Sequence, residues 1–240
     1  MRILVVSDVH ANLPALEAVI AAAGRVDATW HLGDIVGYGP DPDAVVARLR
    51  DLGAIGVRGN HDAAALGGRE IELFNVDARR AMEWTKSVIT PATREWLAAQ
   101  PLQRVDDRHT LVHGSPRDPI WEYITSAPVA RANLALLETR DGLFGHTHLP
   151  IVYRDDRGLV ETVAPQDGST LQLDERRTLL NPGSVGQPRD GDPRASWLVL
   201  DTQRNEAQWG RVAYDIAATQ AAMRARKLPE RLIDRLDYGL

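Results

Sequence analysis

Five short blocks of potential metal ligands each follow a stretch that is typical of a buried strand. The blocks read Asp8-Val9-His10, Gly33-Asp34, Gly59-Asn60-His61-Asp62, His113-Gly114 and Gly145-His146-Thr147-His148. The run before the first block, Ile3-Leu4-Val5-Val6, is continuously apolar, as in a parallel sheet that is covered on both faces. Open α/β sheets place their sites at the carboxyl ends of such strands. The blocks therefore predict an α/β fold with its ligands gathered at one sheet edge.

Seven side chains of these blocks are candidate metal ligands, and one imidazole is left over. The candidates are Asp8, His10, Asp34, Asn60, His113, His146 and His148. A carboxylate has two oxygens, so Asp34 can bridge two cations, and the amide oxygen of Asn60 suits a hard cation. His61 would then face the substrate instead of a metal. This set fits two divalent ions that share one carboxylate, and such centres hydrolyse phosphate esters.

Each block taken alone also has a structural reading. Asp8 could cap the following helix, His10 could lie on the surface, and Gly33-Asp34 or Gly59-Asn60 could be simple turns. The His-x-His pattern is moderately specific, because neutral imidazole is the commonest metal ligand in proteins. The occurrence of all five blocks after strand-like runs favours a metal centre.

The hydrophobic pattern predicts alternating strands and helices in the first part of the chain. Residues 14–24 and 41–52 are predicted helices, and the strand-helix alternation continues to Val57. The stripe from Phe74 to Val88 predicts a long helix, and Trp96-Leu97 a shorter one. Within residues 63–101 these helices would pack into the core, which we favour, or form a small helical cap over the metal site.

From residue 151 the pattern changes to short strands. They are predicted at residues 151–153, 159–163, 171–173, 178–180, 197–200 and 207–212. We expect them to form a second, largely antiparallel sheet. Residues 119–139 and 215–236 are predicted to be helical, with the arginines of the second segment on a solvated face. We find no linker or repeat, so residues 1–240 are predicted to be one domain.

The composition narrows the compartment and the partners. The chain has no cysteine, so disulfides and thiolate metal sites are excluded. No run reaches the roughly 18–20 apolar residues of a membrane span, and no signal-peptide pattern follows Met1, so we expect a cytoplasmic protein without a membrane partner. A net charge of −5 argues against a stable nucleic-acid partner but not against a small nucleotide. Exposed aromatic residues in region 63–101 could support a homo-oligomer.

In the order of its five blocks, the chain closely resembles the calcineurin-like metallophosphoesterases. Residues 181–189 also resemble the late loop of that family. The resemblance implies a four-layer αββα sandwich of two mixed sheets with a dinuclear metal site at its edge. It implies one ion held by Asp8, His10, Asp34 and His148, and a second held by Asp34, Asn60, His113 and His146. It also implies that His61 is the catalytic imidazole.

At one position the sequence differs from some members of that superfamily, and the difference indicates which branch it resembles most. The superfamily's protein phosphatases and symmetrical diadenosine-tetraphosphate hydrolases carry Asp-Arg-Gly or Ala-Arg-Gly where this chain reads Gly37-Tyr38-Gly39-Pro40. A phosphate-binding arginine is therefore missing at that position, whereas Arg58 matches another phosphate-gripping arginine of those enzymes. The pattern is more similar to the small prokaryotic phosphodiesterases.

We therefore expect a phosphodiesterase that acts on small phosphodiesters or nucleotides. A hydroxide that bridges the metals would attack in line, and His61 would protonate the leaving oxygen. Asp34 or Asp62 would orient His61, and Asn12 and Arg58 are candidate phosphate contacts, although Asn12 could equally cap the first helix.

Three other readings stay open, and so does the metal. The oxygen and nitrogen ligand set permits Mn, Fe, Co, Ni or Zn, and we favour Mn²⁺. The alternative functions are a phosphomonoesterase or protein phosphatase, a diadenosine-polyphosphate hydrolase, and a non-catalytic metal-binding scaffold. The intact ligand set and His61 argue against the scaffold.

Overall fold

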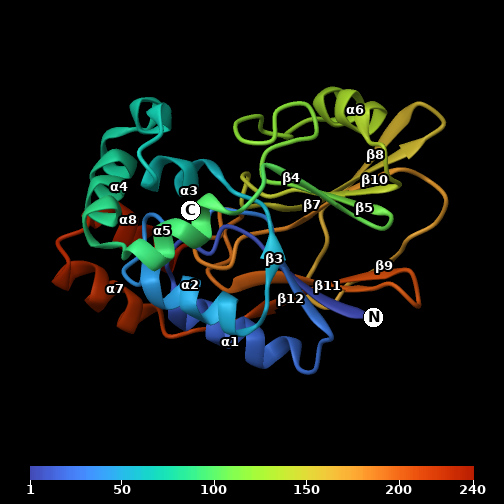
Figure 1. Cartoon of the computed structure of the whole chain (residues 1–240). Coiled ribbons are helices and arrows are strands. Elements are labelled where there is room, and N and C mark those ends of the chain that lie inside the picture. The colour runs from blue at the N-terminus through green and yellow to red at the C-terminus, as the bar shows by residue number, and fades with distance from the viewer.

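Two six-stranded mixed sheets form the centre of the computed structural model, which describes residues 1–240 and all side chains except those of residues 69 and 70 (Figure 1). In the first sheet the order is β3 (Ile55–Gly56), β2 (Ala28–His31), β1 (Arg2–Val6), β11 (Ala195–Asp201), β12 (Glu206–Val212) and β9 (Thr170–Gln172). In the second it is β4 (Gln103–Asp106), β5 (His109–Val112), β6 (Asp141–Leu143), β10 (Thr178–Pro182), β7 (Pro150–Asp156) and β8 (Leu159–Val163).

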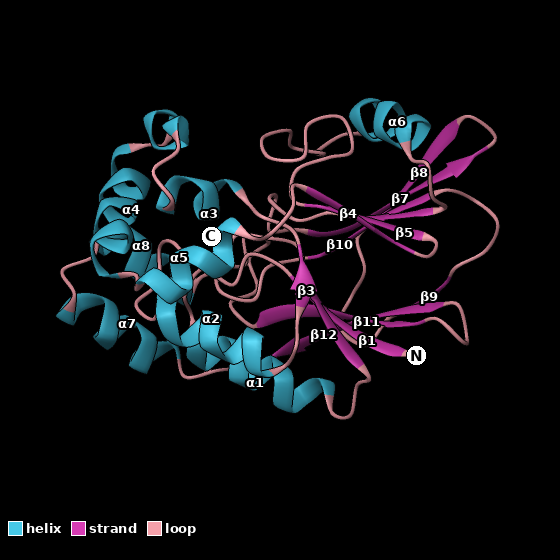
Figure 2. Ribbon diagram, viewed as in Figure 1, coloured by secondary structure: helices cyan, strands magenta, loops and turns pink.

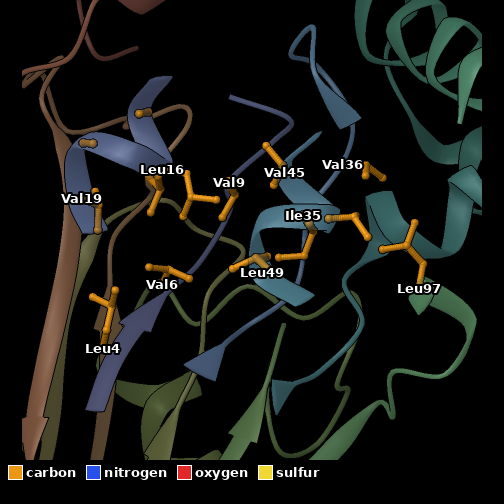
Figure 3. Packing of buried hydrophobic residues seen from close by; sticks show 14 of the residues in the cluster. Leu4, Val6, Val9, Leu16, Val19, Ile35, Val36, Val45, Leu49 and Leu97 are labelled. Atoms are coloured by element: carbon orange, nitrogen blue, oxygen red, sulfur yellow. The ribbon is translucent and has the colours of Figure 1, made fainter. Parts of the chain in front are cut away.

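Strand β1 is buried on both faces, as its apolar run predicts. Successive side chains of a strand point to opposite faces. Ile3 and Val5 therefore join the core between the two sheets, whereas Leu4 and Val6 face the helices (Figure 3). The continuous run in the sequence thus reflects two separate cores, one on each side of the strand.

Helices cover the outer face of each sheet (Figure 2). Helices α1 (Leu13–Ala23) and α2 (Pro42–Asp51) pack on the first sheet, and α6 (Ala127–Leu136) packs on the second. Helix α1 begins after Asn12, whose Oδ1 accepts the backbone N–H of Ala15 at 3.2 Å. The layers are α, β, β and α, so the expected fold is confirmed.

The strands after residue 150 do not form a sheet of their own, and this prediction was wrong. Strands β9, β11 and β12 complete the first sheet, because β11 pairs antiparallel with β1, for example Leu4 with Val199. Strands β7, β8 and β10 extend the second sheet next to β6. Hydrophobic alternation shows that a segment is a strand, but it carries no information about the neighbour with which the strand pairs.

Residues 60–98 form a series of short helices joined by turns, in agreement with the sequence pattern. They form α3 (Asn60–Ala65), the 3-10 helix η1 (Arg69–Leu73), α4 (Val76–Val88) and α5 (Pro91–Ala98). Met82, Ile89 and Leu97 belong to the same buried cluster as Val45 and Leu49 of α2, and Figure 3 shows Leu97 among these residues. The predicted helix over residues 119–139 is only partly correct, because α6 starts at Ala127 and residues 119–126 form a loop beside the ligands.

The C-terminal segment returns to α4. It contains α7 (Ile216–Ala225), α8 (Glu230–Asp234) and the 3-10 helix η2 (Arg235–Asp237). Met223, Leu232 and Ile233 pack in one apolar cluster with Ala78 and Ala81 of α4. Across the part of the chain that the structure describes, no helix has the length and apolar character needed to cross a membrane.

Candidate metal centre

The loops after β1 and β2 run side by side and carry the first ligands. Asp8 donates its backbone N–H to Gly33 O at 3.1 Å, and His10 donates to Asp34 O at 3.0 Å. The late loop after β10 closes on the same place, since Gly186 donates its backbone N–H to Asp8 O at 3.0 Å. The ligand loops are therefore fixed to each other by backbone hydrogen bonds.

A first ligand cluster consists of Asp8, His10, Asp34 and His148, whose ligand atoms all lie within 4.8 Å of one another. All four residues are buried. His10 Nε2 lies 3.2 Å from His148 Nε2 and 3.7 Å from Asp34 Oδ2, and His148 Nε2 lies 3.3 Å from Asp8 Oδ1. Two carboxylate oxygens and two ring nitrogens thus converge on one point.

A second ligand cluster consists of Asp34, Asn60, His113 and His146. His113 Nε2 lies 2.9 Å from Asn60 Oδ1, 3.0 Å from His146 Nδ1 and 3.5 Å from Asp34 Oδ2. Asn60 is the first residue of α3, and Gly59 precedes it as the N-cap. The structure therefore brings together all seven side chains that the sequence singled out as ligands.

Asp34 belongs to both clusters through a single oxygen. Its Oδ2 faces His10 at 3.7 Å and His113 at 3.5 Å. Its Oδ1 instead accepts the backbone N–H of His61 at 2.9 Å. The sequence suggested that Asp34 could bridge two cations through its two oxygens. In the structure only Oδ2 faces the two clusters, and Oδ1 is hydrogen-bonded to the first turn of α3.

The protonation of the imidazoles is set by backbone carbonyls. Nδ1 of His10, His113 and His148 lies 3.2, 2.8 and 2.6 Å from the carbonyl oxygens of Val36, Leu32 and Gln187, respectively. A carbonyl can only accept, so each Nδ1 carries the proton and each Nε2 offers a lone pair to the clusters. This is the arrangement by which proteins orient histidine ligands.

These contacts fit a centre that holds cations. Two lone pairs that face each other at 3.2 Å, as at His10 and His148, repel unless a positive charge lies between them. Asp8 Oδ1 is buried and accepts no hydrogen bond from the described residues. Burial raises the pKa of Asp8 to about 7 and lowers the pKa of His146 to about 2. Divalent ions would compensate the carboxylates while leaving the imidazoles neutral.

Five ligands have an unusual backbone conformation. The φ angles of Asp8, His10, Asp34, His146 and His148 lie between 47° and 63°. Residues other than glycine rarely adopt positive φ, and such residues concentrate at functional sites. The turns point each side chain back toward the shared centre.

His61 lies next to both clusters, and its ring is held by aromatic neighbours. The ring of Phe74 stacks on it at 4.5 Å between centroids, and Tyr38 and His10 lie at 4.4 and 4.8 Å. Its Nδ1 is buried and makes no hydrogen bond with the described residues. Burial and the positive charge of Arg189 hold the pKa of His61 well below its usual value.

The carboxylate of Asp62 accepts hydrogen bonds from the backbone of two neighbouring segments and has no hydrogen bond to the ring of His61. Its Oδ1 accepts the backbone N–H groups of Ile35 and Val36 at 2.9 and 3.1 Å, and its Oδ2 accepts that of Gly59 at 3.0 Å. These bonds connect the loop that carries Asp34 to the start of α3. The expectation that a carboxylate orients the imidazole has no support in these contacts, because Asp34 bonds only the backbone of His61.

The two predicted phosphate contacts do not line the cavity over the clusters. The side-chain amide of Asn12 makes hydrogen bonds within the protein: its oxygen caps α1, and its Nδ2–H donates to Gly186 O at 3.1 Å. Arg58 is absent from the lining of this cavity. Arg189, at the end of the late loop, lines it instead. Nothing in the local pattern of Arg189 marks it as a site residue; only the similarity of its loop to that of the family hints at it.

The cavity over the clusters, here called the metal cavity, has a volume of about 290 Å³. Besides ligands and His61, its walls include Tyr38, Phe74, Trp121, Tyr123 and Arg189. Tyr123 stacks on His146 with 3.8 Å between ring centroids. Glu122 anchors this loop, because it accepts hydrogen bonds from Ser115 Oγ at 2.6 Å and from Asn133 Nδ2 at 2.7 Å. The cavity therefore combines metal ligands, one arginine and an aromatic wall.

The sequence profile of the calcineurin-like phosphoesterase superfamily domain matches residues 1–205. The chain therefore belongs to this superfamily of metal-dependent phosphoesterases, and the predicted class of enzyme is confirmed. It is 29% identical to phosphodiesterase YfcE of Escherichia coli over 84% of this chain and 88% of that protein. It is 35% identical to an uncharacterized protein of Methanocaldococcus jannaschii over 99% of this chain and 98% of the relative.

A solved structure shares the whole architecture. The crystal structure of a metallophosphoesterase from Sphaerobacter thermophilus has a TM-score of 0.93 and 47% sequence identity, and the match covers 100% of this chain and 99% of that one. The four-layer fold is thus common to both chains.

Proposed function

We propose that this chain is a phosphodiesterase that acts on small phosphodiesters or nucleotides. The observation that carries the proposal is the wall of the metal cavity, which offers one arginine, Arg189, beside four aromatic side chains. A phosphodiester carries one negative charge and two organic substituents, whereas a phosphomonoester carries up to two charges and one substituent. A single cation with aromatic surfaces around it suits the diester. The relative that is named a phosphodiesterase supports the same choice.

The ligand assignment belongs to this proposal. We assign one divalent ion to Asp8, His10, Asp34 and His148, and the other to Asp34, Asn60, His113 and His146. Manganese suits this mixture of carboxylate, amide and imidazole ligands. When bound, the two ions supply an acidified water and positive charge for the phosphoryl oxygens.

The residues of the chain then have separate tasks. Arg189 binds a phosphoryl oxygen, because it is the arginine that lines the cavity. His61 protonates the leaving oxygen as general acid. Although burial favours its neutral form, a phosphate anion beside it favours the imidazolium. Phe74 and Tyr38 keep the ring in place. Asp34 accepts the backbone N–H of His61, and Asp62 accepts that of Gly59 at the start of α3.

We also propose that residues 63–101 act as a cap as well as a core element. Leu73, Phe74, Asn75 and Ala78 line the metal cavity from this region. The same region contributes Met82 and Leu97 to the core, so both readings of the apolar stripe apply to different residues. One domain over residues 1–240, a cytoplasmic location and a homo-oligomer stay predictions.

Parallel assays with a diester and a monoester test the proposed function. The metal-stripped protein is given Mn²⁺, Ni²⁺ or Zn²⁺ in turn, and hydrolysis of bis-p-nitrophenyl phosphate is compared with that of p-nitrophenyl phosphate. We expect faster turnover of the bis-ester, with Mn²⁺ the most effective ion. Preference for the monoester would replace the proposal with a phosphomonoesterase. No turnover despite two bound ions per chain would favour the metal-binding scaffold.

A further inference from the structure

A second and larger cavity adjoins the metal cavity and is here called the outer groove. It has a volume of about 940 Å³ and lies between the start of α4 and the C-terminal segment. Tyr38, Asn75, Tyr123 and Arg189 line both spaces, so they are continuous. A substrate whose reacting phosphate sits at the metals can therefore extend into the outer groove.

Three arginines line the outer groove, namely Arg189, Arg231 and Arg235. Among the described side chains, none of the three forms an ion pair with an Asp or Glu. Arg189 donates Nη2–H to Gln187 Oε1 at 2.9 Å, and its Nε is buried without an acceptor. Arg235 is half-buried, and its Nε donates to the terminal carboxyl group of Leu240, the last residue, which also lines the groove. About half of the other arginines whose side chains the structure describes pair with an Asp or Glu, so what sets this cluster apart is that three such arginines without an Asp or Glu partner line one groove.

The cluster carries an electrostatic cost that an anion would relieve. Burial and the charges of Arg189 and Arg231 lower the pKa of Arg235 to about 10. Two carboxylates also line the groove, Asp77 and Asp234, and Asp234 already lies 3.4 Å from Arg224. The groove thus has more positive than negative side chains, although it lies in a protein of net charge −5.

Aromatic side chains stand beside these charges. Tyr38, Tyr123 and Tyr238 line the groove, and Tyr123 and Tyr238 are 48% and 63% exposed. An exposed tyrosine ring offers a flat apolar face against which a nucleobase can stack. The guanidinium group of an arginine can donate two parallel hydrogen bonds to two oxygens of one phosphate. The arginines can bind a phosphate and the tyrosines a base, so the groove suits a nucleotide that carries a free phosphate.

We propose that the substrate is a short nucleotide diester with an additional terminal phosphate, which binds Arg231 and Arg235 in the outer groove while the scissile phosphate lies at the metals. This inference rests on the proposed phosphodiesterase function and specifies its substrate class. Arg189 lies at the junction of the two spaces and faces the scissile phosphate. The adjacent base packs against the tyrosines. The sequence reading of Arg231 and Arg235 as a solvated face is thereby replaced for these two residues.

Matched dinucleotides test the outer groove directly. The probes are adenylyl-(3′→5′)-adenosine with and without a 5′-terminal phosphate. Their dissociation constants and kcat/KM values are measured with the Mn²⁺-loaded protein. We expect the form with the terminal phosphate to bind ten to a hundred times more tightly, the range for hydrogen bonds to a charged group. We expect the same preference in kcat/KM.

Variants assign the preference to its residues. Arg235→Gln and Arg231→Gln should each reduce the ratio between the two probes about tenfold, mainly through KM, whereas Arg235→Lys should restore part of it because the charge is kept. Arg48→Gln is the matched control, because Arg48 pairs with Glu17 at 2.7 Å on the outer face of the first sheet. It should leave the ratio unchanged. Thermal unfolding of each variant checks that the fold is intact.

The outcomes separate the two proposals. Equal affinity of the wild-type protein for both dinucleotides, or a ratio that survives both glutamine variants, would overturn the phosphate subsite even when bis-p-nitrophenyl phosphate is hydrolysed. Failure to hydrolyse any diester would overturn the phosphodiesterase. The binding ratio still decides the subsite in that case, because it needs no turnover.

Discussion

Acidification should destabilise this protein in part through His31, a buried histidine outside the metal centre. His31 is the last residue of β2, is paired with Gly56 of β3, and contacts Trp96 with 5.2 Å between ring centroids. Both ring nitrogens are buried without a hydrogen-bond partner among the described residues. Burial, with the charge of Arg104, lowers its pKa from 6.5 to about 3. The folded protein therefore holds this ring neutral at a pH where the unfolded chain protonates it.

The sign and size of the effect follow from linkage. Between pH 6.5 and 3 the unfolded chain binds more protons at this residue than the folded protein, so the free energy of unfolding falls as the pH falls. With these two pKa values, the loss relative to the neutral ring is about 2 kcal/mol at pH 5. It approaches about 5 kcal/mol below pH 3, where both states are protonated.

Two substitutions isolate this contribution. His31→Leu and His31→Gln both remove the titration, although only the leucine also removes the buried polar atoms. Urea unfolding of each protein is measured at pH 7 and pH 5 with a chelator present, so that loss of metal does not contribute. We expect the pH-dependent loss of stability to be smaller by about 2 kcal/mol in both variants than in the wild-type protein. The same loss in all three proteins would refute the reasoning.

Three further predictions concern the metal centre. His61→Ala should keep both metals but lose roughly 10²–10⁴-fold in kcat, and loss of metal in elemental analysis would contradict its non-ligand role. Asp34→Asn should empty at least one metal position, so two ions per chain by the same analysis would argue against a shared carboxylate. Gly59→Ala should also release metal, because a Cβ there would lie 2.1 Å from Asp34 Oδ1. Gly53→Ala is its control: the φ of +61° strains the backbone there, but the Cβ meets nothing within 4 Å, so this variant should retain both ions.

The convergence of the candidate ligands could be predicted from the sequence because each position is defined locally. Asp8, Asp34 and His113 lie within three residues of the ends of short buried strands, and His146 and His148 follow β6. Parallel strands carry such positions to the same edge of a sheet, so the local pattern is enough to gather them. The helices over residues 14–24 and 41–52 were likewise predicted to within one residue at each end, because capping residues and apolar spacing are local.

What the sequence could not provide is the set of residues that arrive from far along the chain. Arg189 and Arg235 reach the cavities through the packing of the late loop and the C-terminal segment, and no short-range pattern encodes that approach. The same reason explains the error about the second sheet, because β11 pairs with β1 from almost 200 residues away. The shared oxygen of Asp34 also depends on tertiary contacts, since the backbone N–H of His61 occupies the other oxygen.

From the backbone of the loops that carry the candidate ligands, we expect bound metals to contribute to stability as well as to chemistry. Five ligands adopt positive φ, and each such residue costs on the order of 1–2 kcal/mol. The same loops bury carboxylates next to imidazole lone pairs that repel each other. Backbone hydrogen bonds between the loops offset part of this cost. Bound cations would offset the remainder, because the candidate ligands are gathered in the folded protein and dispersed in the unfolded chain. We therefore expect removal of the metals to lower the melting temperature of the protein, and an unchanged melting temperature with a chelator would contradict this reasoning.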